Sequence, residues 1–365
     1  MKALNTVSYH ARLQNFADSS PGRYTIEEIR QQPDTWPVTF QRVLRASLGK
    51  LPPPVVTGAG TSAYAALAIE AAWPGARAIP STELFLDFET PLSTLGLVLS
   101  LARSGDSPES VAVVDKIRKK LPRIRHIALT CNPRGRLANW EGVEAVLLDP
   151  RSNDRSLVMT SSFSNLVLAG TALARPREVE AALPFLCAGA QAVLEQHVAL
   201  AESLAEKPPL RLVALASAPL LGAAREAALK VLEMTAGRVA AMAETYLGLR
   251  HGPMSYVEPD SLVICFLSSD VRRRRYEMDL VSELRVKGIG RLVAVAPPGI
   301  ERACFDAVVA TGASALPDYL RTPADIVFCQ LLGYFLSVRV GLNPDTPSPG
   351  GVIHRVVQGV RIYED

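Results

Sequence analysis

Short apolar runs alternate with longer helix-like segments along this chain of 365 residues. Runs at 55–58, 95–102, 126–131 and 143–149 end in turn residues, and helical patterns follow the first two. Continuous apolar runs of this length are typical of strands that helices cover on both faces. The alternation therefore predicts an α/β fold built on doubly wound parallel sheets with helices on both faces.

The same series of segments occurs a second time along the chain. Three pairs of segments correspond at an offset of about 150 to 165 residues: 52–70 with 208–230, 95–108 with 260–273, and 124–133 with 289–298. A repeat of this size indicates two tandem copies of one α/β unit.

The length of the chain is sufficient for two domains, each with its own core. The mixed, polar residues 1–35 predict an arm, and residues 36–200 a first domain. Residues 201–365 are expected to form a second domain that ends in a tail. A long helical pattern near 175–205 is expected to join the two domains.

The charge balance and the apolar runs argue against several classes of protein. The formal net charge is +3, whereas a nucleic-acid binder usually carries a concentrated basic face. The one basic run, at 271–279, fits a solvated loop or helix start better than an anion-binding role. No apolar run reaches the roughly 18 residues of a membrane span, and the first ten residues lack the apolar core of a secretory signal. We expect a cytoplasmic protein that binds neither nucleic acid nor membranes.

The five cysteines indicate neither a disulfide framework nor a metal site. Their number is odd, and no two of them have the spacing of metal ligands. We expect reduced thiols in the core and no bound metal.

Two of the predicted strand-to-helix loops carry short hydroxyl side chains and glycines. The segment "GAGTSA" (58–63) follows the first apolar run, and "ARSGDSPES" (102–110) follows the second. Glycine allows a close backbone approach, and a helix start offers free N–H groups, so such loops can hold a phosphate. The residues that would do so are Thr61, Ser62, Ser104, Gly105 and Ser107. For Ser107, a helix cap ahead of a proline is an equally good interpretation.

The two loops lack the patterns that bind nucleotides. Neither ends in the G-K-[ST] of a Walker A loop, and "GAGTSA" does not match G-x-G-x-x-G. Loops rich in hydroxyls fit a small sugar phosphate better than a nucleotide or dinucleotide.

Motifs throughout the chain resemble a known family. The sugar isomerase (SIS) domain family is indicated by "TGAGTSAYA" (57–65), "ARSGDSPES" (102–110) and "LTCNPRGRLA" (129–138). The AgaS group within it is indicated by "NDRSLVMTSSFSN" (153–165), "AALKVLEMTAGRV" (227–239), "LGLRHGP" (247–253) and the tail from 341 to 363. The resemblance covers nearly the whole chain from about residue 36. It implies two tandem SIS domains.

The resemblance implies that Ser104, Ser107 and Ser62, with Thr61, hold the phosphate of a sugar. The chain departs from the amino-sugar synthases of the family, which have serine at position 102 and glutamine at position 103. Arg103 is expected either to replace the missing donor with a charge-assisted bond or to extend into solvent.

The second half carries the candidate acid and base. Lys230 and Glu233 lie three residues apart in a helical pattern and so share a face. The spacing of Glu226 and Lys230 also fits an ordinary surface ion pair, and Glu226 is interpreted as structural. The resemblance implies that Glu233 moves a proton between C1 and C2 of the sugar and that Lys230 polarises the substrate or tunes that carboxylate.

A histidine in a "GLRHGPM" loop (248–254) is the remaining candidate. In SIS isomerases the histidine of such a turn assists opening of the sugar ring, often in the site of a neighbouring subunit. The resemblance assigns this role to His251 and implies a homodimer or larger homo-oligomer. The synthases also carry a lysine in the tail, but here the tail has only His354, Arg355 and Gln358 near that place, so a Schiff-base route is not expected.

Proteins of the AgaS group are called tagatose-6-phosphate aldose/ketose isomerases in older naming and isomerising galactosamine-6-phosphate deaminases in newer naming. The resemblance therefore implies an enzyme that converts an amino-hexose 6-phosphate to a ketose phosphate and ammonia, without a metal or redox cofactor. Two alternatives stay open, a plain aldose–ketose isomerase and a non-catalytic sugar-phosphate sensor. The motifs do not decide between galacto and gluco substrates.

Overall fold

The first half of the chain forms a five-stranded parallel sheet, as the alternating pattern predicts. The computed structural model describes residues 21–297 and 299–363. The strands are β1 (Val55–Thr57), β2 (Arg77–Ala78), β3 (Leu97–Ala102), β4 (Arg125–Thr130) and β5 (Glu144–Leu147), in the order β2-β1-β3-β4-β5. Each neighbouring pair is parallel.

The second half forms a second parallel sheet with the same topology. Its strands are β6 (Arg211–Ala216), β7 (Ala240–Glu244), β8 (Leu262–Phe266), β9 (Arg291–Ala296) and β10 (Ala307–Ala310). The strand order is β10-β9-β8-β6-β7. Read in the opposite direction, from β7 to β10, it corresponds strand by strand to the order in the first sheet. The internal repeat in the sequence thus corresponds to two copies of one doubly wound unit, and the predicted fold class is confirmed.

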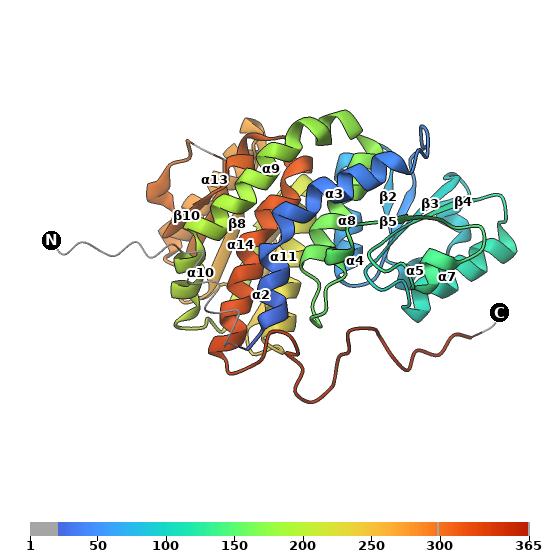
Figure 1. Ribbon diagram of the computed structural model, residues 1–365. Helices are drawn as coiled ribbons and strands as arrows, with labels where there is room; N and C mark the ends of the chain where they lie inside the picture. The colour runs from blue at the N-terminus through green and yellow to red at the C-terminus, as the bar shows by residue number, and fades with distance from the viewer. Residues whose placement is uncertain (1–20, 298, 364–365) are drawn as a thin grey trace.

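Helices cover both faces of each sheet (Figure 1). The longer ones are α2 (Arg23–Arg30), α3 (Gln32–Arg45), α4 (Thr61–Ala72), α7 (Pro108–Lys120), α8 (Ser161–Ala174), α9 (Pro176–Gln196), α10 (Val198–Ala205), α11 (Leu221–Met234), α13 (Val271–Lys287) and α14 (Asp318–Arg339). Single-turn helices are α5 (Ser81–Leu84), α6 (Glu89–Leu92) and α12 (Tyr246–Leu249).

A shared layer of helices joins the two sheets. One continuous apolar cluster includes Ile69 of α4, Phe163 of α8, Ala224 of α11 and Phe328 of α14. Helix α11 packs closely on α4 at Gly222, where an added Cβ would lie 2.9 Å from the backbone N of Ala68. A glycine at this position therefore allows a helix of the second half to lie directly against the helix that follows β1.

The segment predicted as an N-terminal arm is partly helical. Residues 1–20 lie outside the described residues, while α2 and the start of α3 bury Ile26, Ile29 and Trp36. The predicted boundary at residue 35 falls inside α3, and the one at residue 200 falls inside α10. The tail after α14 runs across the bottom of the molecule in Figure 1, from the second half towards the first.

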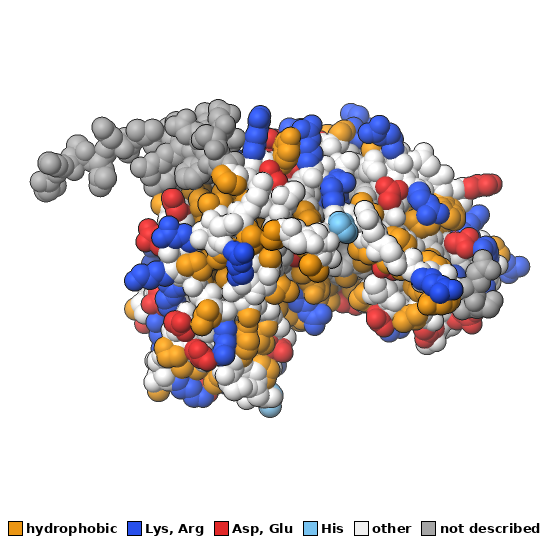
Figure 2. All heavy atoms as spheres, turned by 90° about the horizontal axis from the view of Figure 1, so that it is seen from below, with side chains coloured by type: hydrophobic (Ala, Val, Ile, Leu, Met, Phe, Trp, Pro, Cys, Tyr) orange, Lys and Arg blue, Asp and Glu red, His pale blue; other side chains and the backbone are white. Residues whose placement is uncertain are grey.

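The basic run at 271–279 forms the start of α13. The carboxylate of Asp270 caps this helix by accepting a hydrogen bond from the N–H of Arg273 at 2.9 Å, and most of its arginines are exposed. On the face in Figure 2, basic and acidic side chains lie among one another rather than in one patch. Within the described residues, no helix combines the length and the hydropathy needed to cross a membrane.

A buried histidine in the first sheet gives a testable pH dependence. His126 lies in β4, and its Nε2 is 2.8 Å from the hydroxyl of Ser100. Burial, together with the charge of Arg118, lowers the pKa of His126 from 6.5 to about 4. Between these values the unfolded chain binds a proton that the folded chain does not, so the free energy of unfolding falls as the pH drops from about 6.5 to 4.

Between pH 7 and pH 4, the free energy of unfolding of the variant His126→Gln should fall by about 3 kcal/mol less than that of the wild type. Urea unfolding of the variant and the wild type at pH 7 and pH 4 measures the difference. Parallel pH dependences of the two proteins would show that His126 does not carry the effect.

Candidate active site

The predicted phosphate loops meet at the place where the order of the first sheet reverses. Strands β1 and β3 are neighbours, and their carboxyl ends lead into α4 and α7. Ligands of open α/β sheets bind in the crevice at such a switch point. Gly105 in the second loop has φ +73°, a left-handed conformation that favours glycine.

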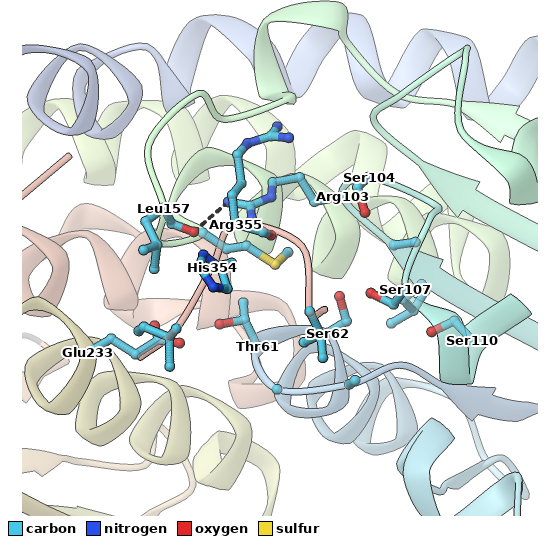
Figure 3. Close-up of a pocket in the computed structure, with 17 residues that line it drawn as sticks. Thr61, Ser62, Arg103, Ser104, Ser107, Ser110, Leu157, Glu233, His354 and Arg355 are labelled. Atoms are coloured by element: carbon cyan, nitrogen blue, oxygen red, sulfur yellow. Dashed lines mark hydrogen bonds between the residues drawn. The ribbon is translucent and has the colours of Figure 1, made fainter. Parts of the chain in front are cut away.

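The two loops and α11 enclose a cavity of about 210 Å³ (Figure 3). Thr61, Ser62, Ser104 and Ser107 line one side of it, and Glu233 lines another. Side chains from the first and second halves of the chain therefore share one space. The start of α7 adds backbone N–H groups that favour an anion.

The hydroxyls of Ser62, Ser104 and Ser107, here called the cradle, are available to a ligand. The hydroxyl of Thr61 is not, because it bonds to Lys230 and Glu226. Ser107 is the N-cap residue of α7, ahead of Pro108, as the sequence predicts, but its side chain makes no capping hydrogen bond to the helix and so stays available to a ligand. The hydroxyl of Ser104 accepts a hydrogen bond from the N–H of Asp106 at 3.2 Å, which leaves its proton free for donation. The side chain of Asn132 holds this loop by donating to the carbonyl of Ser104 at 2.9 Å.

Arg103 is buried beside the cradle, which excludes the expectation that it extends into solvent. Only 6% of it is exposed. Its Nη1 donates to the carbonyls of Ser156 and Leu157 at 3.1 and 2.9 Å, and its Nη2 donates to the carbonyl of Arg355 at 2.6 Å. Burial, and next the charge of Arg355, lowers the pKa of Arg103 to about 10, so the guanidinium stays charged at neutral pH. Its buried Nε has no hydrogen-bond partner in the described part of the chain.

Lys230 is the centre of a buried cluster on α11. Its Nζ lies 2.5 Å from Oε2 of Glu233, 3.0 Å from Oγ1 of Thr61 and 3.4 Å from Oε1 of Glu226. The side chains of Lys230 and Glu226 are fully buried, while that of Glu233 is 25% exposed. The interpretation of Glu226 and Lys230 as a surface pair is therefore wrong, because α4 covers this face of α11.

The electrostatics of this cluster keep the positive charge on the lysine. Burial raises the pKa of Glu226 to about 8, against the opposing effect of Lys230. Burial alone would lower the pKa of Lys230, but Glu226 and Glu233 outweigh it and raise that pKa above its usual value. The ammonium of Lys230 pairs with the Glu233 carboxylate at 2.5 Å, and burial favours the neutral form of Glu226.

The corresponding loops of the second half are filled by the chain's own carboxylates. Asp318 accepts hydrogen bonds from the hydroxyl of Ser268 and from the N–H of Ser269, the latter at 2.7 Å. Glu277 accepts a hydrogen bond from Ser217, which follows β6. Acidic side chains thus occupy the place that remains open in the first half.

His251 and the tail lie differently relative to the cavity of the chain. His251 is exposed in the loop after α12 and does not line the cavity of its own chain. The tail residues Ile353, His354, Arg355 and Val357 do line the cavity. The tail motif "GGVIHRVVQGV" (350–360) signalled the group, but no local pattern indicated which of its side chains would point inward.

The chain has two tandem doubly wound units. The first carries an open, hydroxyl-lined cradle, and the second contributes the helix with Lys230 and Glu233. This combination defines the double-SIS class of phosphosugar proteins. No family model matches the chain. A crystal structure from Clostridium novyi NT superposes with a TM-score of 0.85 at 29% identity and covers 98% of this chain and 97% of that one.

Relatives with higher sequence identity show to which family within this class the chain belongs. The chain is 35% identical to the D-galactosamine-6-phosphate deaminase AgaS of Escherichia coli, covering 95% of this chain and 97% of the relative. It is 34% identical to the protein of that name from Shewanella sp. (strain ANA-3), with 93% and 92% covered. The solved tagatose-6-phosphate ketose/aldose isomerase of Escherichia coli has a TM-score of 0.79 at 31% identity and covers 92% of this chain and 97% of that one. The chain belongs to the AgaS family.

Proposed function

We propose that this protein is an isomerising deaminase that converts galactosamine 6-phosphate to tagatose 6-phosphate and ammonia. The observation that carries the proposal is the single cavity between the phosphate loops and Glu233. An amino-hexose 6-phosphate has an anionic end and, at its other end, carbons that exchange a proton. The names of the AgaS relatives support the same substrate.

The phosphate is bound at the first-half loops. Ser62, Ser104 and Ser107 donate hydrogen bonds to its oxygens, and the start of α7 and the charge of Arg103 stabilise the anion. Because these contacts are the same before and during the reaction, they supply binding rather than rate.

The proton transfer takes place at the other end of the cavity. Glu233 takes the proton from C2, which gives an enolamine, and returns it to C1. The product is a ketimine, whose carbon–nitrogen bond is hydrolysed by one water to a ketone and ammonia. General acid–base catalysis of this kind contributes about 10²–10⁴-fold per well-placed group. Lys230 holds the Glu233 carboxylate in position and lies near the developing negative charge.

Opening of the sugar ring requires a further group. His251 is exposed in its own chain, and we propose that it acts in the cavity of a second copy, within a homodimer or larger homo-oligomer. We also place the reaction in the cytoplasm.

The test is the purified protein with galactosamine 6-phosphate, with ammonia and ketose phosphate measured in parallel. The proposal expects the two products in equal amounts. A plain isomerase, which the name of the solved Escherichia coli protein favours, would interconvert galactose 6-phosphate and tagatose 6-phosphate and release no ammonia. Tight binding of the sugar phosphate without turnover would indicate a sensor.

The phosphate role of Ser104 has its own prediction. The variant Ser104→Ala should raise KM by about tenfold and change kcat little, because a contact made equally in the ground and transition states supplies uniform binding. Steady-state kinetics measure both constants. Ser110→Ala is the matched control, since Ser110 also lines the cavity but its hydroxyl already donates to Ser81 at 3.4 Å. A fall in kcat at constant KM would contradict the role.

A further inference from the structure

His354 projects from the C-terminal tail into the middle of the cavity. In Figure 3 it lies between Glu233 on one side and the serines of the phosphate loops on the other. The cavity can be divided into three zones: the cradle serines, the end at Glu233, and a middle zone that the tail covers.

Most other polar side chains that line the cavity are already engaged. Thr61 bonds to Lys230, and Ser110 donates to Ser81. Arg355 donates to Asn153 and to the carbonyl of Asp154. The imidazole of His354 is exposed at the cavity, and no hydrogen bond joins it to another described residue. It is a polar group in the cavity that belongs neither to the phosphate cradle nor to the Lys230 cluster.

The backbone beside His354 is held in place by two arginines. Arg103 donates to the carbonyl of Arg355 at 2.6 Å. The guanidinium of Arg355 donates at 2.8 Å to the side chain of Asn153 and, from Nε at 2.9 Å, to the carbonyl of Asp154. These bonds tie the tail to the phosphate loop and to the loop at 153–157. A side chain on such a fixed segment is pre-organised to contact a ligand.

We propose that His354 is the specificity-determining residue of this site and hydrogen-bonds the hydroxyl on C4 of the sugar. This inference rests on the proposed function, which places the phosphate on carbon 6 at the cradle and carbons 1 and 2 at Glu233. Carbon 4 then lies in the middle zone. Galacto and gluco sugars differ only in the configuration at that carbon, so a donor or acceptor fixed on one side of it separates the two. The imidazole can serve as either partner.

The test compares two hexitol phosphates that bind but do not react. Dissociation constants of galactitol 6-phosphate and glucitol 6-phosphate are measured by calorimetry for the wild type, His354→Ala and His354→Asn. The wild type should bind the galacto compound about tenfold more tightly, as one neutral hydrogen bond allows. His354→Ala should lose most of that ratio by weakening the galacto compound, and His354→Asn, whose amide also hydrogen-bonds, should retain most of it.

A control variant separates hydrogen bonding from packing of the tail. Val357→Ala removes another cavity-lining side chain of the tail that has no polar group, and it should leave the ratio unchanged. The inference is overturned if the wild type shows no preference, if His354→Ala keeps the wild-type ratio, or if Val357→Ala lowers the ratio as much. A wild type that prefers galactitol 6-phosphate but releases no ammonia from galactosamine 6-phosphate would refute the proposed function while supporting the role of His354.

Discussion

Replacement of Glu233 by glutamine is expected to lower kcat by about 10³-fold, within the range of one general base, and to leave the Kd for the sugar phosphate nearly unchanged. The glutamine amide has almost the same shape as the carboxylate and can still accept the hydrogen bond that Lys230 donates at 2.5 Å. It cannot take a proton from carbon. Because the phosphate contacts lie on the other side of the cavity, binding should persist.

Two measurements make this test specific. Ammonia release gives kcat, and exchange of the C2 proton with deuterated solvent reports the proton transfer itself, so both should fall together. Glu180→Gln is the matched control, since it makes the same chemical change on the exposed face of α9. It should leave both ammonia release and proton exchange unchanged. Near-normal exchange in Glu233→Gln would remove Glu233 from the reaction.

The positions of the two hydroxyl-rich loops were predictable because the information for them is local. An apolar strand, a glycine, hydroxyls and a helix start follow one another at 55–62 and at 97–108, and parallel strands bring their carboxyl ends to one edge. The sequence repeat likewise predicts the second sheet. The position of Glu233 opposite these loops required the resemblance, since no short segment contains both.

Other features depend on packing between segments that are distant in the chain. The spacing of Glu226 and Lys230 is the same on a solvated helix and on a buried one. What buries the pair is the close approach of α4 to α11 at Gly222. In the same way, the contacts of Arg103 join it to residues 156 and 355, and a local pattern around position 103 contains no information about either.

The role that the resemblance assigns to His251 requires a second subunit. The resemblance assigns it to ring opening, whereas the described chain holds it on an exposed loop away from its own cavity. A role in a neighbouring subunit's cavity reconciles the two, because a site shared between subunits leaves no trace in the packing of one chain.

The second large effect is expected for Lys230→Met, which should lower kcat by about 10²-fold or more at pH 7.5 and add a pH-dependent loss of stability. Methionine fills much of the volume of lysine, but it has no charge and cannot donate the hydrogen bonds that Lys230 donates to Glu233 and Thr61. Glu233 then lacks the group that orients it. The chain should still fold at neutral pH, because Glu226 can retain its proton.

The stability of this variant should diverge from that of the wild type above about pH 8. A buried carboxyl with a raised pKa binds a proton that the unfolded chain releases, so the free energy of unfolding falls by about 1.4 kcal/mol per pH unit until the folded group ionises. In the wild type that ionisation comes at about pH 8. Without Lys230 the pKa of Glu226 rises further, and the loss continues to higher pH.

The double variant Lys230→Met/Glu226→Gln separates the two roles of the lysine. Glutamine cannot ionise, so the extra loss of stability above about pH 8 should disappear in urea unfolding. Activity should remain low, because Glu233 still lacks the ammonium that lies 2.5 Å from it in the wild type. If activity returns together with stability, Lys230 acts only through Glu226, and its role beside the reacting carbons is refuted.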